Sequence, residues 1–462
     1  MNQRFDAVVI GAGQAGPPLA ERLGKSGRKV AVIERKLVGG TCVNAGCIPT
    51  KAMVASAYVA QMGRRASDYG VLAESEVRVD MQRVWERTQG ISGQSRSSVE
   101  KWLGGMQNVS LLRGQAVFES PRSVRVGDAL IEADEFFINV GGRAIVPDFP
   151  GIDTVPYLTN TSILALRELP RHLVIIGGSY IGLEFGQMFR RFGAAVTIVE
   201  RGDRLLPRED PEVSAAVVDI LQKEGIAFHL SAECIEVHGR AGEVRVVAKC
   251  ADPRLEVLGT HVLLAVGRRP NTDDLGLQNA GVATDERGYI TVDDQCRTQV
   301  KGIWALGDCN GRGAFTHTSY NDFEIVAANV LDGEARRISD RIGAYALYID
   351  PPLARIGLTE QEARKQGRKI DIGVRPMTRV GRAVERGETL GFMKVIVDSD
   401  SQQLLGAAIL GVNGDEVIHS LLDVMYAKAP YRTVTHAMHI HPTVAELLPT
   451  VLQDLHHAPQ SP

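Results

Sequence analysis

No run of apolar residues in this 462-residue sequence approaches the roughly 18 to 20 that a membrane-spanning helix needs. The apolar stretch at residues 7–10 is too short for a signal peptide and continues into glycines. A dominant charge is also missing, because 52 Lys and Arg residues face 55 Asp and Glu residues, for a net charge of -3. These absences give no sign of a membrane or nucleic-acid partner, and we expect a cytoplasmic protein.

Cysteine is scarce: the chain has six, and only Cys42 and Cys47 lie close together in sequence. In a reducing compartment we expect free, catalytic or metal-binding thiols in place of a structural disulfide framework. We expect the other four to be small core residues. They are Cys234, Cys250, Cys296 and Cys309.

A strand, a glycine-rich turn, a helix and a second strand ending in an acid occur twice. In the first copy, apolar residues 7–10 precede GAGQAG, which begins at Gly11, and the unit ends at Glu34. In the second copy, apolar residues 173–176 precede GGSYIG, which begins at Gly177, and the unit ends at Glu200. The acid follows the first glycine by 23 positions in both copies (34 − 11 and 200 − 177). This repetition predicts two dinucleotide-binding units.

The physical basis is the same in both copies. Glycines let the backbone approach a pyrophosphate, the helix N-terminus offers unpaired N–H groups, and the acid accepts ribose hydroxyls. In the second copy Ser179 occupies the position of the middle glycine. Glu200 favours NADH because a carboxylate repels a 2′-phosphate, while Arg201 and Arg204 leave NADPH possible.

Glycine follows apolar runs at three further places, at Gly141, at Gly267 and in the segment 302–308 that ends in Asp308. Such a glycine lets a backbone or a cofactor come close, and Asp308 could bond a polyol chain. Helical spacing covers residues 52–103. After about residue 342, antiparallel-looking strands and helices around 415–428 and 444–456 indicate a separate α+β domain.

Cys42 and Cys47 lie in GGTCVNAGCIPTK, directly after the first repeat. They are five residues apart at the start of a predicted helix, and Asn44 and Gly46 permit a distorted first turn. Their Cα atoms could then approach within the roughly 4.4 to 6.8 Å that a disulfide requires. The helix N-terminus and Lys51 would stabilise a thiolate.

With these segments, the chain resembles the class I pyridine nucleotide-disulfide oxidoreductases, the family of dihydrolipoamide dehydrogenase, glutathione reductase and mercuric reductase. GGTCVNAGCIPTK resembles the family's active-site signature, and VGGR, GGSYIGLE, VGRRPN, ALGD and HPTVAE follow in its order. The resemblance implies FAD, with NADH or NADPH as the second cofactor. The expected FAD contacts are Gly11, Gly13, Gly16, Glu34, Thr41 and Asp308, and the expected nicotinamide nucleotide contacts are Gly177, Gly182 and Glu200. Gly141 and Gly267 are also expected to bind a cofactor.

The resemblance also implies catalytic roles. Lys51 would pair with Glu184 beside the flavin, Cys47 would contact the flavin, and Cys42 would be the interchange thiol. His441 and Glu446 match an acid–base dyad that the family's neighbouring subunit supplies, which makes a homodimer obligatory. Nearby His436 and His439 are spaced too irregularly for one helix face, so we expect no metal site.

The implied fold class is α/β, with two doubly wound, Rossmann-like nucleotide-binding domains and a C-terminal α+β dimerisation domain. We expect an FAD-binding domain at 1–147, an NAD(P)-binding domain at 148–270, a central segment completing the FAD site at 271–342, and the dimerisation domain at 343–462.

The acceptor is less constrained than the fold. VGGR and the segment 351–360 are similar to the mercuric-reductase-like branch, which includes the bacterial reactive-chlorine-resistance flavoprotein reductase. The C-terminus carries no cysteine pair to deliver mercury. We therefore expect a reductase of a small oxidant, disulfide or metal ion. The alternatives are a dihydrolipoamide dehydrogenase and, from another class, a flavoprotein that senses NADH or binds a partner without turnover.

Overall fold

A computed structural model describes residues 2–72, 76–249 and 254–458, so Cys250 lies outside the described residues. The first sheet has the order β3-β2-β1-β6-β5-β4, with β16 also pairing with β6. Its parallel strands are β1 (Asn2–Ile10), β2 (Val30–Glu34), β3 (Val109–Arg113), β6 (Ala129–Ile138) and β16 (Ile303–Ala305). The antiparallel edge is formed by β4 (Ala116–Ser120) and β5 (Ser123–Val126). A strand from the predicted central segment thus completes the first sheet.

The second sheet repeats the parallel arrangement in the order β10-β9-β8-β14. Its strands are β10 (Ala227–His229), β9 (Ala195–Val199), β8 (His172–Ile176) and β14 (His261–Leu264). The predicted helices form as α1 (Gly16–Lys25) and α5 (Tyr180–Phe192), each directly after its glycine turn. The helix α6 (Pro211–Lys223) leads to β10. Both predicted strand–helix–strand units are therefore present.

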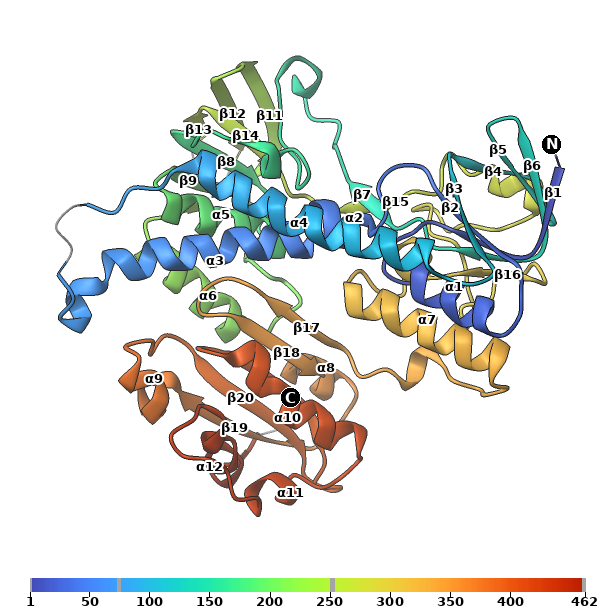
Figure 1. Ribbon diagram of the computed structural model, residues 1–462. Helices are drawn as coiled ribbons and strands as arrows, with labels where there is room; N and C mark the ends of the chain where they lie inside the picture. The colour runs from blue at the N-terminus through green and yellow to red at the C-terminus, as the bar shows by residue number, and fades with distance from the viewer. Residues whose placement is uncertain (1, 73–75, 250–253, 459–462) are drawn as a thin grey trace.

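Smaller elements complete this half of the molecule. A three-stranded antiparallel sheet consists of β11 (Glu233–Arg240), β12 (Glu243–Lys249) and β13 (Arg254–Gly259). A two-stranded pairing of β7 (Gly142–Ala144) with β15 (Arg268–Pro270) joins segments of the two predicted nucleotide-binding domains. On the first sheet, α7 (Thr316–Leu331) packs beside α1 (Figure 1).

The predicted helical stretch 52–103 is two helices, not one. The helix α3 (Cys47–Arg64) follows the short α2 (Gly40–Ala45), and α4 (Met81–Gly104) runs back beside them (Figure 1). The reversal falls near Gly70, whose φ of 74° suits glycine. Arg87 on α4 donates to the Ala52 carbonyl on α3. The cysteine segment therefore lies against α4.

The C-terminal region contains a six-stranded antiparallel sheet in the order β17-β18-β21-β20-β19-β22. Its strands are β17 (Ala344–Leu347), β18 (Leu353–Gly357), β21 (Leu404–Leu410), β20 (Phe392–Asp398), β19 (Ile370–Pro376) and β22 (His456–His457). Its helices are α8 (Glu360–Lys365), α9 (Gly381–Glu385), α10 (Gly414–Tyr426), α11 (Arg432–Thr435) and α12 (Leu448–Gln453). The helix expected at 444–456 was thus placed too long: its last residues pair as a strand with β19.

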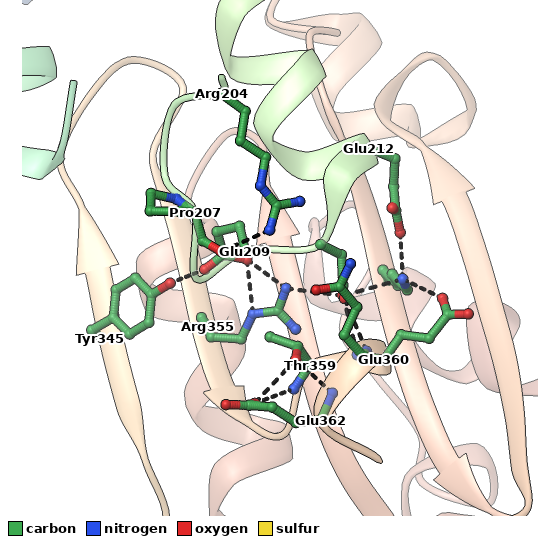
Figure 2. Close-up of polar contacts among 12 residues, drawn as sticks. Arg204, Pro207, Glu209, Glu212, Tyr345, Arg355, Thr359, Glu360 and Glu362 are labelled. Carbon is green, nitrogen blue, oxygen red and sulfur yellow. Dashed lines mark hydrogen bonds and ion pairs between the residues drawn. The ribbon is translucent and has the colours of Figure 1, made fainter. Parts of the chain in front are cut away.

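A buried ionic cluster joins the C-terminal sheet to the loop before α6 (Figure 2). Arg355 on β18 donates through Nε to Glu209 Oε2 at 3.0 Å. Lys394 on β20 donates to Asp210 Oδ2 at 3.2 Å and to Glu360 Oε2 at 2.7 Å. Because Arg355, Lys394, Glu209 and Asp210 are all buried, each charge depends on its partners to offset its lost hydration.

Candidate active site

A cavity of about 1240 Å³ lies at the carboxyl ends of the first sheet's parallel strands, where such sheets bind ligands. It exceeds the roughly 300 to 1,000 Å³ of most small-molecule pockets, as a dinucleotide requires. Many of the predicted site residues meet there although they are far apart in sequence. The cavity is lined by Gly11, Gly13, Glu34, Thr41, Cys42, Cys47, Lys51, Gly141, Glu184 and Asp308, among others.

The cysteines occupy the junction between α2 and α3. Cys42 lies inside α2, and Cys47 is the first residue of α3. Gly46 separates the helices, and a Cβ there would meet the Thr41 carbonyl oxygen at 2.8 Å and the Cys42 Cα at 3.2 Å. Asn44 holds the turn by donating to the carbonyls of Val38 and Gly40 at 2.8 and 2.9 Å. The sequence thus bends the segment so that both thiols border the cavity.

The pKa values of the two thiols are shifted in opposite directions. The hydrogen bond from Cys42, with help from Thr316 and Lys51, lowers the pKa of Cys47 to about 6. The same hydrogen bond, together with burial, raises the pKa of Cys42. Cys47 is therefore the thiol of the pair that ionises first.

Thr316 is a site residue that the sequence did not reveal. Its Oγ1 lies 3.2 Å from Cys47 Sγ, and it is the first residue of α7. No motif marks it, because a threonine at the start of a helix is ordinary. Only the packing of α7 against the first sheet brings it to the thiols.

Lys51 and Glu184 form an ion pair at the cavity wall, with Nζ 2.8 Å from Oε2. Glu184 is buried and also accepts from the Tyr348 backbone N–H at 2.9 Å. The Lys51 ammonium also lies 4.5 Å from the centroid of the Tyr348 ring. These contacts fix the ammonium close to Cys47. Tyr348 was missed at the sequence level for the same reason as Thr316.

The glycines of the first turn fit a bound dinucleotide. Cβ atoms at Gly11 and Gly16 would clash with backbone oxygens at 2.2 Å, so helix–strand packing alone requires these two glycines. At Gly13 the closest atom would be Asn139 Nδ2 at 3.3 Å, so a Cβ there would point into the cavity without a backbone clash. Glu34 Oε2 accepts from the Ala12 N–H at 2.9 Å, which anchors the carboxylate beside the turn. Gly16 itself does not line the cavity.

Asp308 closes the cavity from the central segment. Its carboxylate lies 3.6 Å from Arg268 Nη2, and burial raises the pKa of Asp308. The side chain is 25% exposed, and a carboxylate with one distant cationic partner retains free acceptor positions for hydroxyl groups. Gly141 has a φ of 64°, and a Cβ at this position would have no atom within 4 Å, so the neighbouring wall is open. The acceptor oxygens of Asp308 and the open wall at Gly141 fit the flavin dinucleotide that the resemblance implies.

The second glycine turn lies outside this cavity. Glu200 accepts from the N–H groups of Gly178 and Gly202 at 2.6 and 2.7 Å. These two bonds hold its carboxylate beside the glycine turn. Ser179 precedes α5 in extended backbone and makes no side-chain capping bond, which leaves the first N–H groups of α5 available to a pyrophosphate. Gly177 and Gly182 pack against backbone oxygens, and Gly267 accepts from the Ile145 N–H at 3.0 Å.

The predicted dyad lies in the C-terminal region, away from the cavity lining. His441 Nδ1 is 2.9 Å from Glu446 Oε2, and the imidazole is 80% exposed. The neighbouring apolar side chains Met438 and Ile440 are 99% and 79% exposed. The expectation for the other cysteines was partly wrong: Cys296 and Cys309 are buried, but Cys234 is exposed near the start of β11.

Comparison with known families decides the classification. The model described as pyridine nucleotide-disulphide oxidoreductase matches residues 5–322, and that of its dimerisation domain matches residues 344–452. The chain belongs to this family. Pyridine nucleotide-disulphide oxidoreductases are flavoprotein enzymes that use FAD and NAD(P)H, so the predicted fold, enzyme class and cofactors are confirmed. In the described part of the chain, no helix is long and apolar enough to cross a membrane.

Three relatives within the family match nearly the full chain. The probable pyridine nucleotide-disulfide oxidoreductase RclA of Escherichia coli is 37% identical over 96% of this chain and 98% of its own. The dihydrolipoyl dehydrogenase of Bacillus subtilis is 35% identical over 96% and 94%, and the mercuric reductase of Staphylococcus aureus 32% over 94% and 81%. The Cu(II) complex of the HOCl-induced flavoprotein disulfide reductase RclA from Escherichia coli superimposes with a TM-score of 0.89, at 36% identity, covering 98% of this chain and 99% of that one.

Proposed function

We propose that Cys42 and Cys47 form the redox centre that passes electrons from a nicotinamide nucleotide to a small oxidant, disulfide or thiophilic metal ion. The main support for this proposal is that the pKa of Cys47 is lowered while that of Cys42 is raised. When bound in the cavity, the FAD that the family uses would supply the two-electron chemistry that connects the nicotinamide nucleotide with the disulfide. Cys47, beside Lys51 and Thr316, holds the resulting negative charge.

The residues of the chain suffice for exchange with a disulfide acceptor. Cys42 loses its proton to a base, and its sulfur attacks the acceptor, so that one S–S bond forms as the acceptor's bond breaks. The first leaving thiolate takes up the proton that the base removed from Cys42. The Cys47 thiolate then attacks the Cys42 sulfur, which releases the second half of the acceptor as a thiolate that solvent protonates, and restores the Cys42–Cys47 disulfide. Two electrons leave the pair in each cycle.

We assign the base to His441 of a second copy of the chain. Glu446 orients the imidazole through Nδ1, which leaves Nε2 for proton transfer. The exposure of His441, Met438 and Ile440 supports a homodimer in which this segment is covered by the other subunit. The exposed thiol of Cys234 fits a reducing, cytoplasmic location.

We further propose NADH as the preferred donor. Glu200 presents a carboxylate at the turn that would receive the adenosine ribose, and its two backbone bonds fix it there. A 2′-phosphate would meet this negative charge at close range. Arg201 next to Glu200 is exposed and is the residue that leaves NADPH possible.

For the acceptor, similarity to RclA favours a detoxifying reductase, since that structure is a Cu(II) complex of an HOCl-induced protein. The second candidate is a dihydrolipoamide dehydrogenase, favoured by the presence of both thiols and the His441–Glu446 pair and by the Bacillus subtilis relative.

The deciding experiment is steady-state oxidation of NADH with lipoamide, oxidised glutathione, Hg(II), Cu(II) and hypothiocyanite as acceptors. Fast turnover of a metal ion or oxidant with slow turnover of lipoamide supports the detoxifying reductase. Fast lipoamide turnover supports the dehydrogenase. If none of these acceptors supported NADH oxidation, the result would instead favour a flavoprotein that senses NADH or binds a partner.

A further inference from the structure

Arg96 on α4 faces the cysteine segment. Its Nη1 donates to Asn44 Oδ1 at 3.2 Å, and Asn44 lies between Cys42 and Cys47 in sequence. The amide of Asn44 is already held by two backbone carbonyls, so its oxygen points to Arg96. The guanidinium is therefore one side chain away from the turn that carries both thiols.

The helix α4 contacts this turn without lining the cavity. Asn44 lines the cavity together with both cysteines, whereas no described residue of α4 does. If the flavin fills the cavity, an acceptor that reaches Cys42 from outside the cavity would come close to α4, which contacts the turn. Arg96 is thus a cation beside the cysteine turn but outside the cavity lining, unlike Lys51, which lines the cavity itself.

The charge of Arg96 is also uncompensated. Within the described ranges Arg96 forms no ion pair, and it is half-buried. By contrast, Arg83 on the same helix is 85% exposed and lies 3.6 Å from Asp80. A half-buried cation without a counterion acts over a longer range than an exposed pair, because less solvent screens it.

We propose that Arg96 is a specificity-determining residue that favours anionic acceptors at Cys42. The proposal rests on the proposed function, since it presumes that Cys42 attacks the acceptor. A carboxylate on the acceptor would be attracted to the guanidinium during approach and attack, and an ammonium would be repelled. Unlike charges near a protein surface attract by about 1 to 4 kcal/mol at 4 Å, and less at greater distance.

The test uses three small disulfides that differ in charge: dithiodiglycolate with two carboxylates, bis(2-hydroxyethyl) disulfide with none, and cystamine with two ammonium groups. The FAD-loaded dimer reduces each with NADH, and kcat/KM is compared for the wild type, Arg96→Met and Arg96→Lys. Arg83→Met is the matched control, since it removes the same charge from an exposed position on α4. FAD content and anaerobic flavin reduction by NADH show whether each variant is folded.

In Arg96→Met we expect the kcat/KM ratio of dithiodiglycolate to cystamine to fall about tenfold, with most of the preference kept in Arg96→Lys and in Arg83→Met. Added salt should lower the wild-type ratio and leave that of Arg96→Met nearly unchanged. Equal slowing of all three disulfides would overturn the proposal and make Arg96 a residue that only positions Asn44. If the wild type reduced none of the three or any other acceptor, the proposed function itself would fail.

Discussion

The hydroxyl of Thr316 lies 3.2 Å from the sulfur of Cys47, although 269 positions separate the two residues. Cys47 begins α3 and Thr316 begins α7, so two helix N-termini meet at one sulfur atom. Both termini place partial positive charge near the sulfur, and the hydroxyl adds a donor. These contacts stabilise the Cys47 thiolate in addition to the hydrogen bond from Cys42, which is the largest cause of its lowered pKa.

This contact predicts a pH dependence. Because the pKa of Cys47 is lowered to about 6, the thiolate is present above that pH and is lost as the pH falls through it. Thr316→Val should raise the midpoint by about one to two pH units, since a hydrogen bond to a charged group contributes about 1.5 to 3 kcal/mol. The midpoint is measured by labelling Cys47 with iodoacetamide at a series of pH values and quantifying the product by mass spectrometry. Thr316→Ser should keep the wild-type midpoint; a shift in Thr316→Ser as large as in Thr316→Val would exclude the hydroxyl as the cause.

Substitutions of the two cysteines should have different effects. Cys47→Ala should retain FAD but lose disulfide reduction and the long-wavelength thiolate-to-flavin absorbance on reduction. Cys42→Ser should keep a thiolate on Cys47, and hence that absorbance, while losing turnover. Absorbance spectra of both variants and their rates with a disulfide test this. Unchanged turnover in Cys47→Ala would contradict the proposed mechanism.

His441→Gln should slow thiol exchange by roughly 10²- to 10⁴-fold, as expected for a proton-transfer residue, while flavin reduction by NADH stays fast. Stopped-flow measurement separates the two half-reactions. Equal slowing of both would give His441 a structural role.

A subunit-mixing experiment tests the shared site. Cys42→Ser and His441→Gln subunits, each inactive alone, should regain roughly a quarter of wild-type activity after random reassociation, because half the dimers then contain one intact site of two. No recovery, with mixed dimers demonstrated by mass spectrometry, would place His441 in its own subunit's site.

Nucleotide preference should depend on Glu200. Glu200→Ala should lower the discrimination for NADH over NADPH, because it removes the charge that would oppose a 2′-phosphate. Glu200→Gln is the matched control, since it removes the charge but retains an oxygen that can accept from Gly178 or Gly202. Comparison of kcat/KM for both nucleotides checks this. A Glu200→Ala variant with full discrimination would refute the role given to this carboxylate.

The local units of the fold were predictable from the sequence, and the contacts between distant segments were not. GAGQAG and GGSYIG specify their turns within a few residues, so both strand–helix–strand units, with helices α1 and α5, formed where expected. The division of the stretch 52–103 into α3 and α4 was not predicted. Thr316 and Tyr348 reach the site only through packing, and domain boundaries and residue roles stay predictions.

The ionic cluster is a second example of such distant contacts, since Arg355 and Glu209 are 146 positions apart. Arg355→Met should destabilise the protein by about 3 to 5 kcal/mol, because it leaves buried Glu209 without a counterion, whereas Asp210 keeps Lys394. Thermal unfolding monitored by flavin fluorescence measures the effect. Adding Glu209→Gln to Arg355→Met should recover part of the loss, because it removes one stranded charge. A loss that the second substitution deepens would show that charge compensation is not the cause.

The most direct test of the central claim is an anaerobic titration of the FAD-loaded protein with NADH, followed by thiol labelling and mass spectrometry. The account predicts that Cys42 and Cys47 are protected from alkylation before NADH is added and are both labelled afterwards, while labelling of Cys234 does not change. The long-wavelength absorbance should rise in parallel. Complete flavin reduction without new labelling of Cys42 and Cys47 would contradict the claim that this pair is the redox centre.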